Sequence, residues 1–427
     1  MRPLRVICRL NALLLTFDVL PLSLLGCYGV EWIETPHFDE LSAQGLTFDF
    51  CFATQDLSPG LVVADSGETV TWQSGDELSP RLDGDDIEAA IIGRWTERIT
   101  AAFPNCRLQT SRETSLIDAL DHGFLDTPLQ SLGELSLQWL RLTGLPEQLI
   151  PPSALFDLYL EEFFTPVELR DAVAHWLKQP PEYIAEHSNK QPLSDFDWVT
   201  EHVEAMLELG LLDRDHRPAD TELTRFRLAL AGAIISQLDT QLGELLEALE
   251  PAVLSDETVV IVAGLTGQLL MQHPHVAQGM PPLVDERLHV PLWVWSNEPD
   301  WSGVRRRELT ETAAVIDLLQ AFSSGRTPIR SACHHDVSGI KPASDKFATL
   351  PVSDAILWRW ADGPGALRTS RHHCVVDSWQ SIETGGDRDD EVKHWLFLKP
   401  GDIWDLRDES SQSPEMTRTL AEQLCSP

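Results

Sequence analysis

A long helix followed closely by a buried strand places the strongest constraint on how this chain can fold. Between Arg227 and Leu249, leucine and isoleucine recur at helical spacing, which predicts an amphipathic helix that Pro251 is expected to end. The run Val259–Val262 is apolar and β-branched throughout, which is typical of a strand covered on both faces. Such a strand needs helices on both sides of its sheet. The pair therefore predicts an α/β layered fold with a mostly parallel central sheet.

Other segments extend this alternation of strands and helices. Strands are expected at Ala12–Phe17, Leu135–Leu142 and Val290–Trp295. Ser323-Ser324-Gly325 then begins a looser, polar stretch. We therefore divide the chain into an α/β domain, residues 1–325, and a small C-terminal α+β subdomain, residues 326–427. In the subdomain we expect strands at Ile356–Trp360, His373–Val376 and Trp395–Leu398 and a last helix from about Pro414.

Composition limits the classes of partner. The chain has 32 Lys+Arg against 67 Asp+Glu, a net charge of −35. This charge repels nucleic acid and anionic membranes, because phosphate binding needs clustered basic residues. No run reaches the roughly 18 apolar residues of a membrane span. The seven cysteines are scattered without a CxxC, which favours a reducing compartment. Asn11 and Asp18 interrupt the apolar N-terminal stretch, so we interpret it as the first strand rather than a signal peptide and expect a cytoplasmic location.

Two motifs near the N-terminus point to a known family. The chain reads L-G-C-Y-G and then T-P-x-x-D-x-L-x-x-x-G-x-x-F within residues 13–54. This segment is similar to the opening of the sulfatase family, which belongs to the alkaline-phosphatase-like superfamily. The positions that match are Asp18, Gly26, Tyr28, Gly29, Thr35, Pro36, Asp39, Leu41, Gly45 and Phe48.

The resemblance continues in residues 234–295, where ISQLDTQLGELLEALE, TVVIVAGLTG and VDERLHVPLWVW look like the family's long helix and late strands. It is weak over about residues 60–220, which we take as a variable insertion. The resemblance implies an α/β/α sandwich with a C-terminal subdomain. It also implies a divalent cation such as Ca²⁺ or Mg²⁺, a formylglycine nucleophile made from a C-x-P-S-R cysteine, and basic side chains that neutralise the sulfate.

When the family's site residues are aligned with this chain, the first metal ligand is present but the nucleophile is replaced. The family's first metal aspartate falls on Asp18, and the next position, often a second aspartate, is Val19. The C-x-P-S-R motif falls on residues 57–61, LSPGL, so Leu57 replaces the nucleophile and Leu61 the arginine. A shifted register offers Thr54 or Ser58 as a hydroxyl nucleophile instead.

A second site motif lies just past the buried strand, where ligands bind in open α/β sheets. The family pattern D-H-G-x-x-x-x-x-H-x-x-x-x-K falls on this chain without a gap. Leu265 replaces the metal aspartate, Thr266 its neighbour and Gln278 the lysine, while His273 is retained. A hard divalent cation needs about six oxygens, usually from several carboxylates. The resemblance therefore implies a degenerate site.

Several residues keep two interpretations. Asp18 either binds a metal or pairs with a base or a helix end. His273 and His275 are either ligands or surface-loop residues. The tryptophans of the expected strands, Trp293, Trp295, Trp358 and Trp360, favour packing over sugar stacking. Two Cys/His clusters are either halves of a zinc site or unrelated: Cys333-His334-His335-Asp336 and His372-His373-Cys374.

Our leading hypothesis is a sulfatase-like protein without sulfuric ester hydrolase activity. It would need no cofactor and would bind a protein or small-molecule ligand. The alternative is an active metal-dependent sulfate or phosphate ester hydrolase with a rearranged site around Asp18, Thr54 or Ser58, and His273. A partner subunit of an active relative is a third reading.

Overall fold

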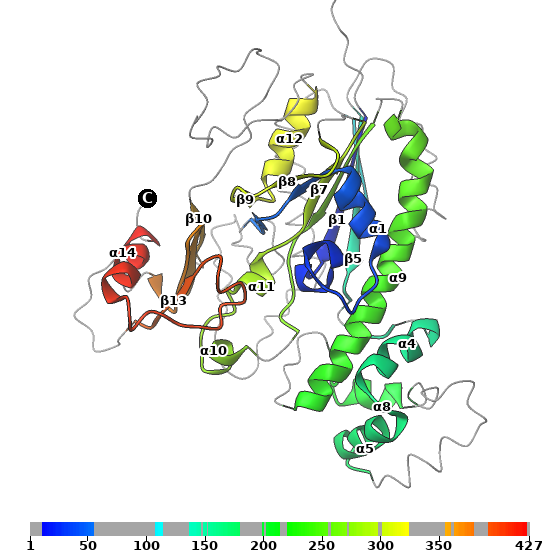
Figure 1. Ribbon diagram of the computed structural model, residues 1–427, viewed down its shortest axis with the longest axis vertical. Helices are drawn as coiled ribbons and strands as arrows, with labels where there is room; N and C mark the ends of the chain where they lie inside the picture. The colour runs from blue at the N-terminus through cyan, green and yellow to red at the C-terminus, as the bar shows by residue number, and fades with distance from the viewer. Residues whose placement is uncertain are drawn as a thin grey trace, which may run out of the picture.

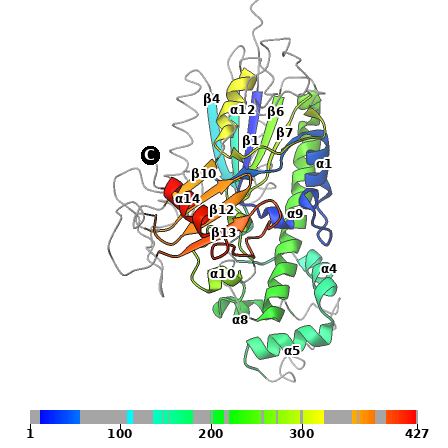
Figure 2. The same cartoon turned by 60° about the vertical axis from the view of Figure 1, so that its left-hand side comes forward.

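The computed structural model describes fourteen segments of the chain. Within them the chain forms a seven-stranded sheet between helices and a separate four-stranded antiparallel sheet (Figures 1 and 2). This confirms the predicted α/β sandwich with a small C-terminal α+β subdomain. The described residues are 11–54, 107–113, 136–146, 148–151, 153–179, 199, 202–213, 220–254, 258–270, 273–297, 301–323, 355–359, 363–379 and 392–424.

The central sheet is mixed but mostly parallel. Its strand order is β4-β5-β1-β6-β7-β2-β8. The four strands from β4 to β6 are mutually parallel, whereas β7 runs antiparallel to both of its neighbours. The strands are β1 (Asn11–Val19), β2 (Leu46–Phe48), β4 (Arg107–Glu113), β5 (Ser136–Gly144), β6 (Thr258–Gly264), β7 (Leu292–Trp295) and β8 (Val304–Arg306), and a small separate pair joins β3 (Cys51–Phe52) to β9 (Thr310–Glu311).

Alternating side chains of the central strands enter two different apolar clusters. Leu13 and Val260 pack with α1 (Pro36–Gln44) and α9 (Thr221–Leu254) on one face of the sheet. Leu14 packs with α12 (Ala314–Ser323) on the other face. Figure 1 shows these helices on opposite sides of the sheet. The continuous apolar runs are thus explained, because both faces are covered.

The long helix extends past both predicted ends. Asp220 accepts hydrogen bonds from the amides of Glu222 and Leu223, so α9 begins at Thr221. Pro251 does not end it; α9 continues to Leu254. Pro251 removes the amide that would bond the Glu247 carbonyl, and the helix continues for three residues beyond it despite this loss.

Three helices of the expected insertion lie beside the N-terminal half of α9. They are α4, which the sequence did not indicate, α5 and α8. Their apolar residues Leu160, Leu169 and Met206 belong to the same cluster as the sheet residues on that face. The bounds are α4 (Ser153–Phe163), α5 (Pro166–Trp176) and α8 (Val203–Glu208); short helices are η1 (Leu22–Leu24), η2 (Gly26–Tyr28), α10 (Pro274–Ala277) and α11 (Asp285–Leu288).

The C-terminal sheet has the strand order β10-β11-β12-β13, with α14 packed on it (Figure 2). Trp358 is buried and donates its indole N–H to the Ala53 carbonyl, which ties this sheet to the α/β part. Within the described part of the chain, no helix combines the length and apolarity needed to span a bilayer. The elements are β10 (Ala355–Arg359), β11 (Gly365–Thr369), which was not predicted, β12 (His372–Val376), β13 (His394–Leu398) and α14 (Pro414–Leu424).

Candidate functional site

Asp18 lies at the carboxyl end of β1, where the expected site should be. Arg141 of the neighbouring strand β5 points its guanidinium at this carboxylate. Nε and Nη2 lie 2.9 and 2.8 Å from Oδ1, and both side chains are more than nine-tenths buried. Gly144 ends β5 with a left-handed backbone, and a Cβ there would lie 2.1 Å from the Val19 carbonyl oxygen. This close approach and the hydrogen bond from the Leu145 amide to the Val19 carbonyl hold the two strand ends together, so the ion pair is a fixed part of the sheet.

Two positions after β6, at which the resemblance implies replaced ligands, stabilise the fold. Leu265 is fully buried in the apolar cluster on the α12 face, and its amide donates to the Phe17 carbonyl. The Thr266 hydroxyl is buried and donates to the carbonyls of Gly267 and Arg287. Neither side chain offers a carboxylate toward Asp18.

His273 binds the C-terminal loop. Its Nε2 lies 3.0 Å from the Trp404 carbonyl oxygen, so that nitrogen carries the proton, and Nδ1 accepts from the Val276 amide as the N-cap of α10. His275 makes a parallel bond, with Nε2 2.9 Å from the Leu406 carbonyl oxygen. Burial lowers the pKa of His273, which keeps the ring neutral for this bond. Gln278, the position of the family lysine, is exposed.

Of the two candidate hydroxyl nucleophiles, the structure describes Thr54 but not Ser58. Thr54 is buried, and its hydroxyl accepts hydrogen bonds from the Ala313 amide (2.9 Å) and the Thr312 hydroxyl (3.0 Å). Thr54 and His273 are thus bonded to different elements, the start of α12 and the C-terminal loop. Leu57, Ser58 and Leu61 lie outside the described residues, as do Trp360 and Cys333 through Asp336.

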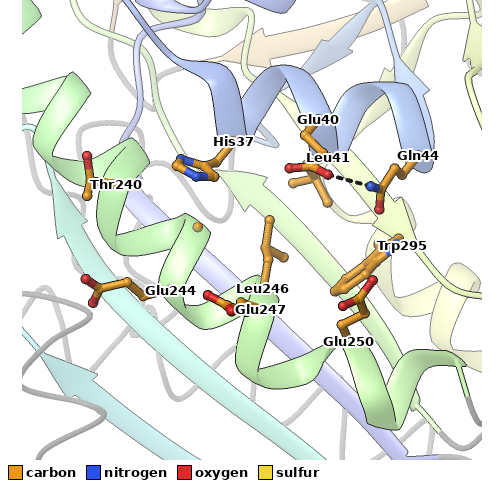
Figure 3. Close-up of a pocket in the computed structure, with 11 residues that line it drawn as sticks. His37, Glu40, Leu41, Gln44, Thr240, Glu244, Leu246, Glu247, Glu250 and Trp295 are labelled. Atoms are coloured by element: carbon orange, nitrogen blue, oxygen red, sulfur yellow. Dashed lines mark hydrogen bonds between the residues drawn. The ribbon is translucent and has the colours of Figure 1, made fainter.

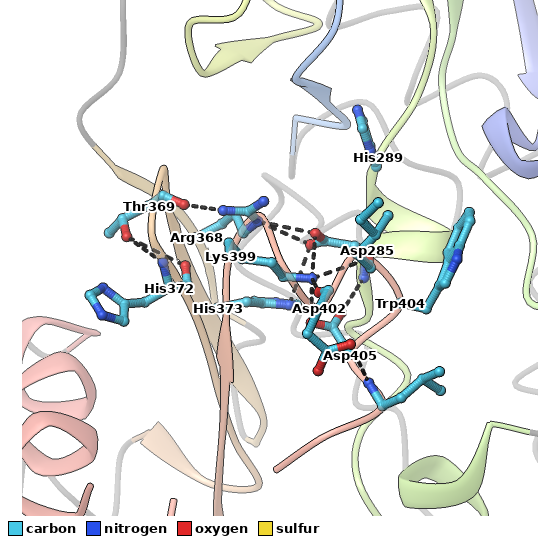
Figure 4. A network of polar contacts seen from close by, with 12 residues as sticks. Asp285, His289, Arg368, Thr369, His372, His373, Lys399, Asp402, Trp404 and Asp405 are labelled. Atoms are coloured by element: carbon cyan, nitrogen blue, oxygen red, sulfur yellow. Dashed lines mark hydrogen bonds and ion pairs between the residues drawn. The ribbon is translucent and has the colours of Figure 1, made fainter. Parts of the chain in front are cut away.

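A second buried carboxylate site joins the two sheets, and we call it the junction cluster: Asp285, Arg368, His373, Lys399 and Asp405 (Figure 4). The Lys399 ammonium lies 2.8 Å from Asp285 Oδ2 and 2.7 Å from Asp405 Oδ1. Arg368 Nε is 3.2 Å from both Asp285 oxygens. His373 Nδ1 is 3.0 Å from Asp405 Oδ2 and 3.3 Å from Asp285 Oδ1.

The junction cluster holds a possible set of metal ligands. One ligand atom each from Asp285, His373 and Asp405 lie within 4.8 Å of one another. However, the Lys399 ammonium already lies between the carboxylates, where a cation would bind. Burial raises the pKa of Asp405, but His373, Lys399 and the Asp285 amide outweigh it and hold that pKa well below its usual range. The cluster is therefore neutralised by side chains of this chain.

A groove of about 380 Å³ lies between α1 and α9 (Figure 3). The buried Asp239 accepts from His37 Nδ1 at 2.9 Å and from the first amides of α1, so it caps that helix. A Cβ at Gly243 would lie 2.4 Å from the His37 ring, so only glycine lets the ring pack on α9. Both features hold α1 against α9. Four glutamates surround the groove: Glu40, Glu244, Glu247 and Glu250.

Sequence reasoning missed Arg141 and most of the junction cluster. The available signal was a basic residue inside an apolar strand pattern: Arg141 in LSLQWLRL, Arg368 in GALRT and Lys399 after HWLFL. The second half of the expected zinc site, His372-His373-Cys374, forms β12. Its residues are used separately, since His373 joins the cluster while Cys374 is buried in apolar packing, which raises its thiol pKa to about 12.

The fold is similar to several solved structures. One is a protein in complex with its substrate D-glucosamine-2-N,6-O-disulfate, with a TM-score of 0.59 and 11% identity over 97% of each chain. Another is the phosphonate monoester hydrolase of Silicibacter pomeroyi, with a TM-score of 0.52 and 13% identity over 97% of this chain and 94% of that one. No protein-family model and no curated protein sequence matches the chain. The chain thus has the same fold as these solved structures, which is the α/β sandwich that the sequence resemblance implied.

Proposed function

We propose that this chain is a sulfatase-fold protein that does not hydrolyse sulfate or phosphate esters and acts by binding or scaffolding. The observation that carries the proposal is the buried pair of Asp18 with Arg141. Asp18 is the one metal carboxylate that the sequence motifs retain, and a positive side chain already neutralises it.

A divalent cation does not fit beside this pair. A cation that coordinates either oxygen of Asp18 would come close to Arg141, because the guanidinium lies 2.8 Å from Oδ1 of the same small carboxylate. At an effective dielectric constant of about 20, a divalent cation about 4 Å from a guanidinium is repelled by about 8 kcal/mol. This repulsion removes much of the attraction between the cation and the Asp18 carboxylate, and one carboxylate does not supply the several oxygens that a hard cation needs in place of its water ligands.

The neighbouring residues do not replace the missing ligands. A hard cation needs about six oxygens. Leu265 supplies none, and Thr266 supplies at most one neutral hydroxyl oxygen, whose hydrogen is directed to the carbonyls of Gly267 and Arg287. His273 uses Nε2 for the Trp404 carbonyl and Nδ1 for the Val276 amide. The donor set supports a position that stabilises the fold rather than one that holds an ion.

The metal content of the dialysed protein tests the proposal, together with hydrolysis of p-nitrophenyl sulfate, p-nitrophenyl phosphate and a phosphonate monoester. We expect well under one divalent ion per chain and no hydrolysis above that of Asp18→Ala. Glu40→Ala, which removes an exposed carboxylate from α1, is the matched control. One ion per chain, with turnover that Asp18→Ala abolishes and Glu40→Ala retains, would contradict the proposal. It would favour the active hydrolase with a rearranged site.

A further inference from the structure

A groove of about 600 Å³ lies on the C-terminal subdomain, between β13 and α14. Figure 1 shows α14 on the side of its sheet that faces away from the central sheet. Among the described residues, none that lines the groove carries a carboxylate, although acidic residues outnumber basic ones 67 to 32 in the chain. Its lining consists of Val392, Lys393, His394, Trp395, Ser410, Ser411, Pro414, Thr417 and Arg418.

The basic side chains of this groove are not used by the fold. Lys393 is exposed, and the hydrogen bonds that it forms with Asp377 use its backbone amide and carbonyl rather than its ammonium group. Arg418 is 74% exposed and lies 3.8 Å from Glu422, a distance and exposure at which an ion pair contributes little. By contrast, Lys399 in the same subdomain is buried between two carboxylates. The groove therefore keeps positive charge available for a ligand.

The strand pattern directs a third polar side chain to the same groove. Leu396 packs in the apolar cluster beneath α14, and His394 lies two residues earlier on β13. Because side chains alternate along a strand, His394 lies on the α14 face. Ser411 adds an exposed hydroxyl, whereas the Ser410 hydroxyl is bonded to Asp408. Hydroxyl and cationic groups together suit the oxygens of a tetrahedral anion.

The first turn of α14 carries both the partial positive charge of its amides and the carboxylate of Glu415. The helix has 11 residues and begins at Pro414, which lines the groove. The amides of a first helical turn carry partial positive charge. Small-molecule sites occupy about 300–1,000 Å³, so the groove accommodates an organic group as well as its anion.

We propose that the groove between β13 and α14 binds a small molecule bearing a sulfate or phosphate group, with Lys393, His394 and Arg418 supplying the positive charge. This site is separate from Asp18, so it stands whether or not the protein hydrolyses esters.

Calorimetric titration of the full-length protein at low ionic strength tests this proposal. The probes are inorganic sulfate, inorganic phosphate, glucose 6-sulfate and glucose 6-phosphate, with glucose as the uncharged control. The test variant is Lys393→Gln combined with Arg418→Gln. The matched control is Arg371→Gln, which removes an exposed charge from the same subdomain, next to the end of β13 opposite the groove. All changed side chains are exposed, so folding should be preserved, and thermal unfolding checks this.

We expect saturable binding of the charged probes, none of glucose, and affinity reduced roughly tenfold or more in the double variant but within twofold in Arg371→Gln. Tighter binding of the glucose esters than of the inorganic ions would identify an ester ligand, and equal binding a free oxyanion; both support the site. Absence of binding, or equal losses in the double variant and Arg371→Gln, would overturn it.

Discussion

The Asp18 pair and the junction cluster are both buried carboxylate sites, yet they have different roles. At Asp18, one carboxylate meets one guanidinium from the next strand of the same sheet. In the junction cluster, Asp285 of the α/β part meets Arg368, Lys399 and Asp405 of the C-terminal part. The first neutralises a position within the sheet, whereas the second holds two sheets together. Basic side chains thus occupy both places where carboxylates could have attracted a metal.

The largest effect is expected from Lys399→Met. This change leaves the Asp285 and Asp405 carboxylates facing each other without the ammonium between them. Removing one partner of a buried charge cluster typically costs about 3–5 kcal/mol of unfolding free energy. Urea unfolding measures the loss, and limited proteolysis shows whether the C-terminal part detaches first. The control is Lys393→Met, which changes an exposed lysine at the other end of β13. It should alter the unfolding free energy by less than about 0.5 kcal/mol. Equal effects would show that Lys399 does not hold the junction.

Arg141→Met should cost somewhat less, about 3 kcal/mol, because it leaves one buried carboxylate rather than two. The double variant Asp18→Leu, Arg141→Met should recover much of the loss, since an apolar pair can replace a buried ion pair. Thermal unfolding of the two single variants and the double variant gives the interaction free energy between Asp18 and Arg141. Each is measured with and without Ca²⁺ or Mg²⁺. Stabilisation of Arg141→Met by either ion would identify Asp18 as a latent metal ligand and weaken the contrast with the junction cluster.

A smaller effect is expected from acid, which should lower the unfolding free energy through the buried histidines at a higher pH than through the Asp405 carboxylate. Burial lowers the pKa of His273 and of His289, despite the carbonyl bonds that they donate. Below the unfolded value of about 6.5, the unfolded chain binds protons that the folded chain excludes. Unfolding free energy therefore falls as pH drops below about 6.5, by at most about 1.4 kcal/mol per histidine and pH unit. Asp405, with its lowered pKa, adds stability that is lost only below about pH 4.

Urea unfolding midpoints at pH 8, 6 and 5 measure the loss of stability that is assigned to the buried histidines. A variant with His273→Gln and His289→Gln should show a flatter profile between pH 8 and 5 and retain the loss at lower pH. A wild-type profile that stays flat down to pH 4 would contradict the assignment of this window to buried histidines.

The layered fold could be predicted because its signals are local. The apolar runs of β1 and β6 and the periodicity of α9 each specify an element within a few residues. Elements without such patterns, β11 and α4, were missed. The predicted end of α9, Leu249, was wrong by five residues, because Pro251 was expected to stop a helix that continues to Leu254.

The polar partners could not be predicted, because they depend on register and on contacts distant in sequence. Arg141 reaches Asp18 across 123 residues through the pairing of β5 with β1. Asp285 reaches Asp405 across 120 residues through the packing of one sheet against another. The motif comparison predicted which expected ligands are replaced, but not the side chain that faces Asp18. The replacements at Leu57 and Leu61, outside the described residues, remain predictions.

The 34-residue helix α9 has a consequence for how the molecule opens. It is about 50 Å long, and its apolar face belongs to one cluster that includes both the sheet and the helices α4, α5 and α8. Separating those helices from the sheet would expose apolar surface along much of its length. Amide protons in the middle of α9 should therefore exchange with solvent only when the whole domain unfolds, and at similar rates on either side of its midpoint. The helical insertion and the sheet would then form one cooperative unit rather than two.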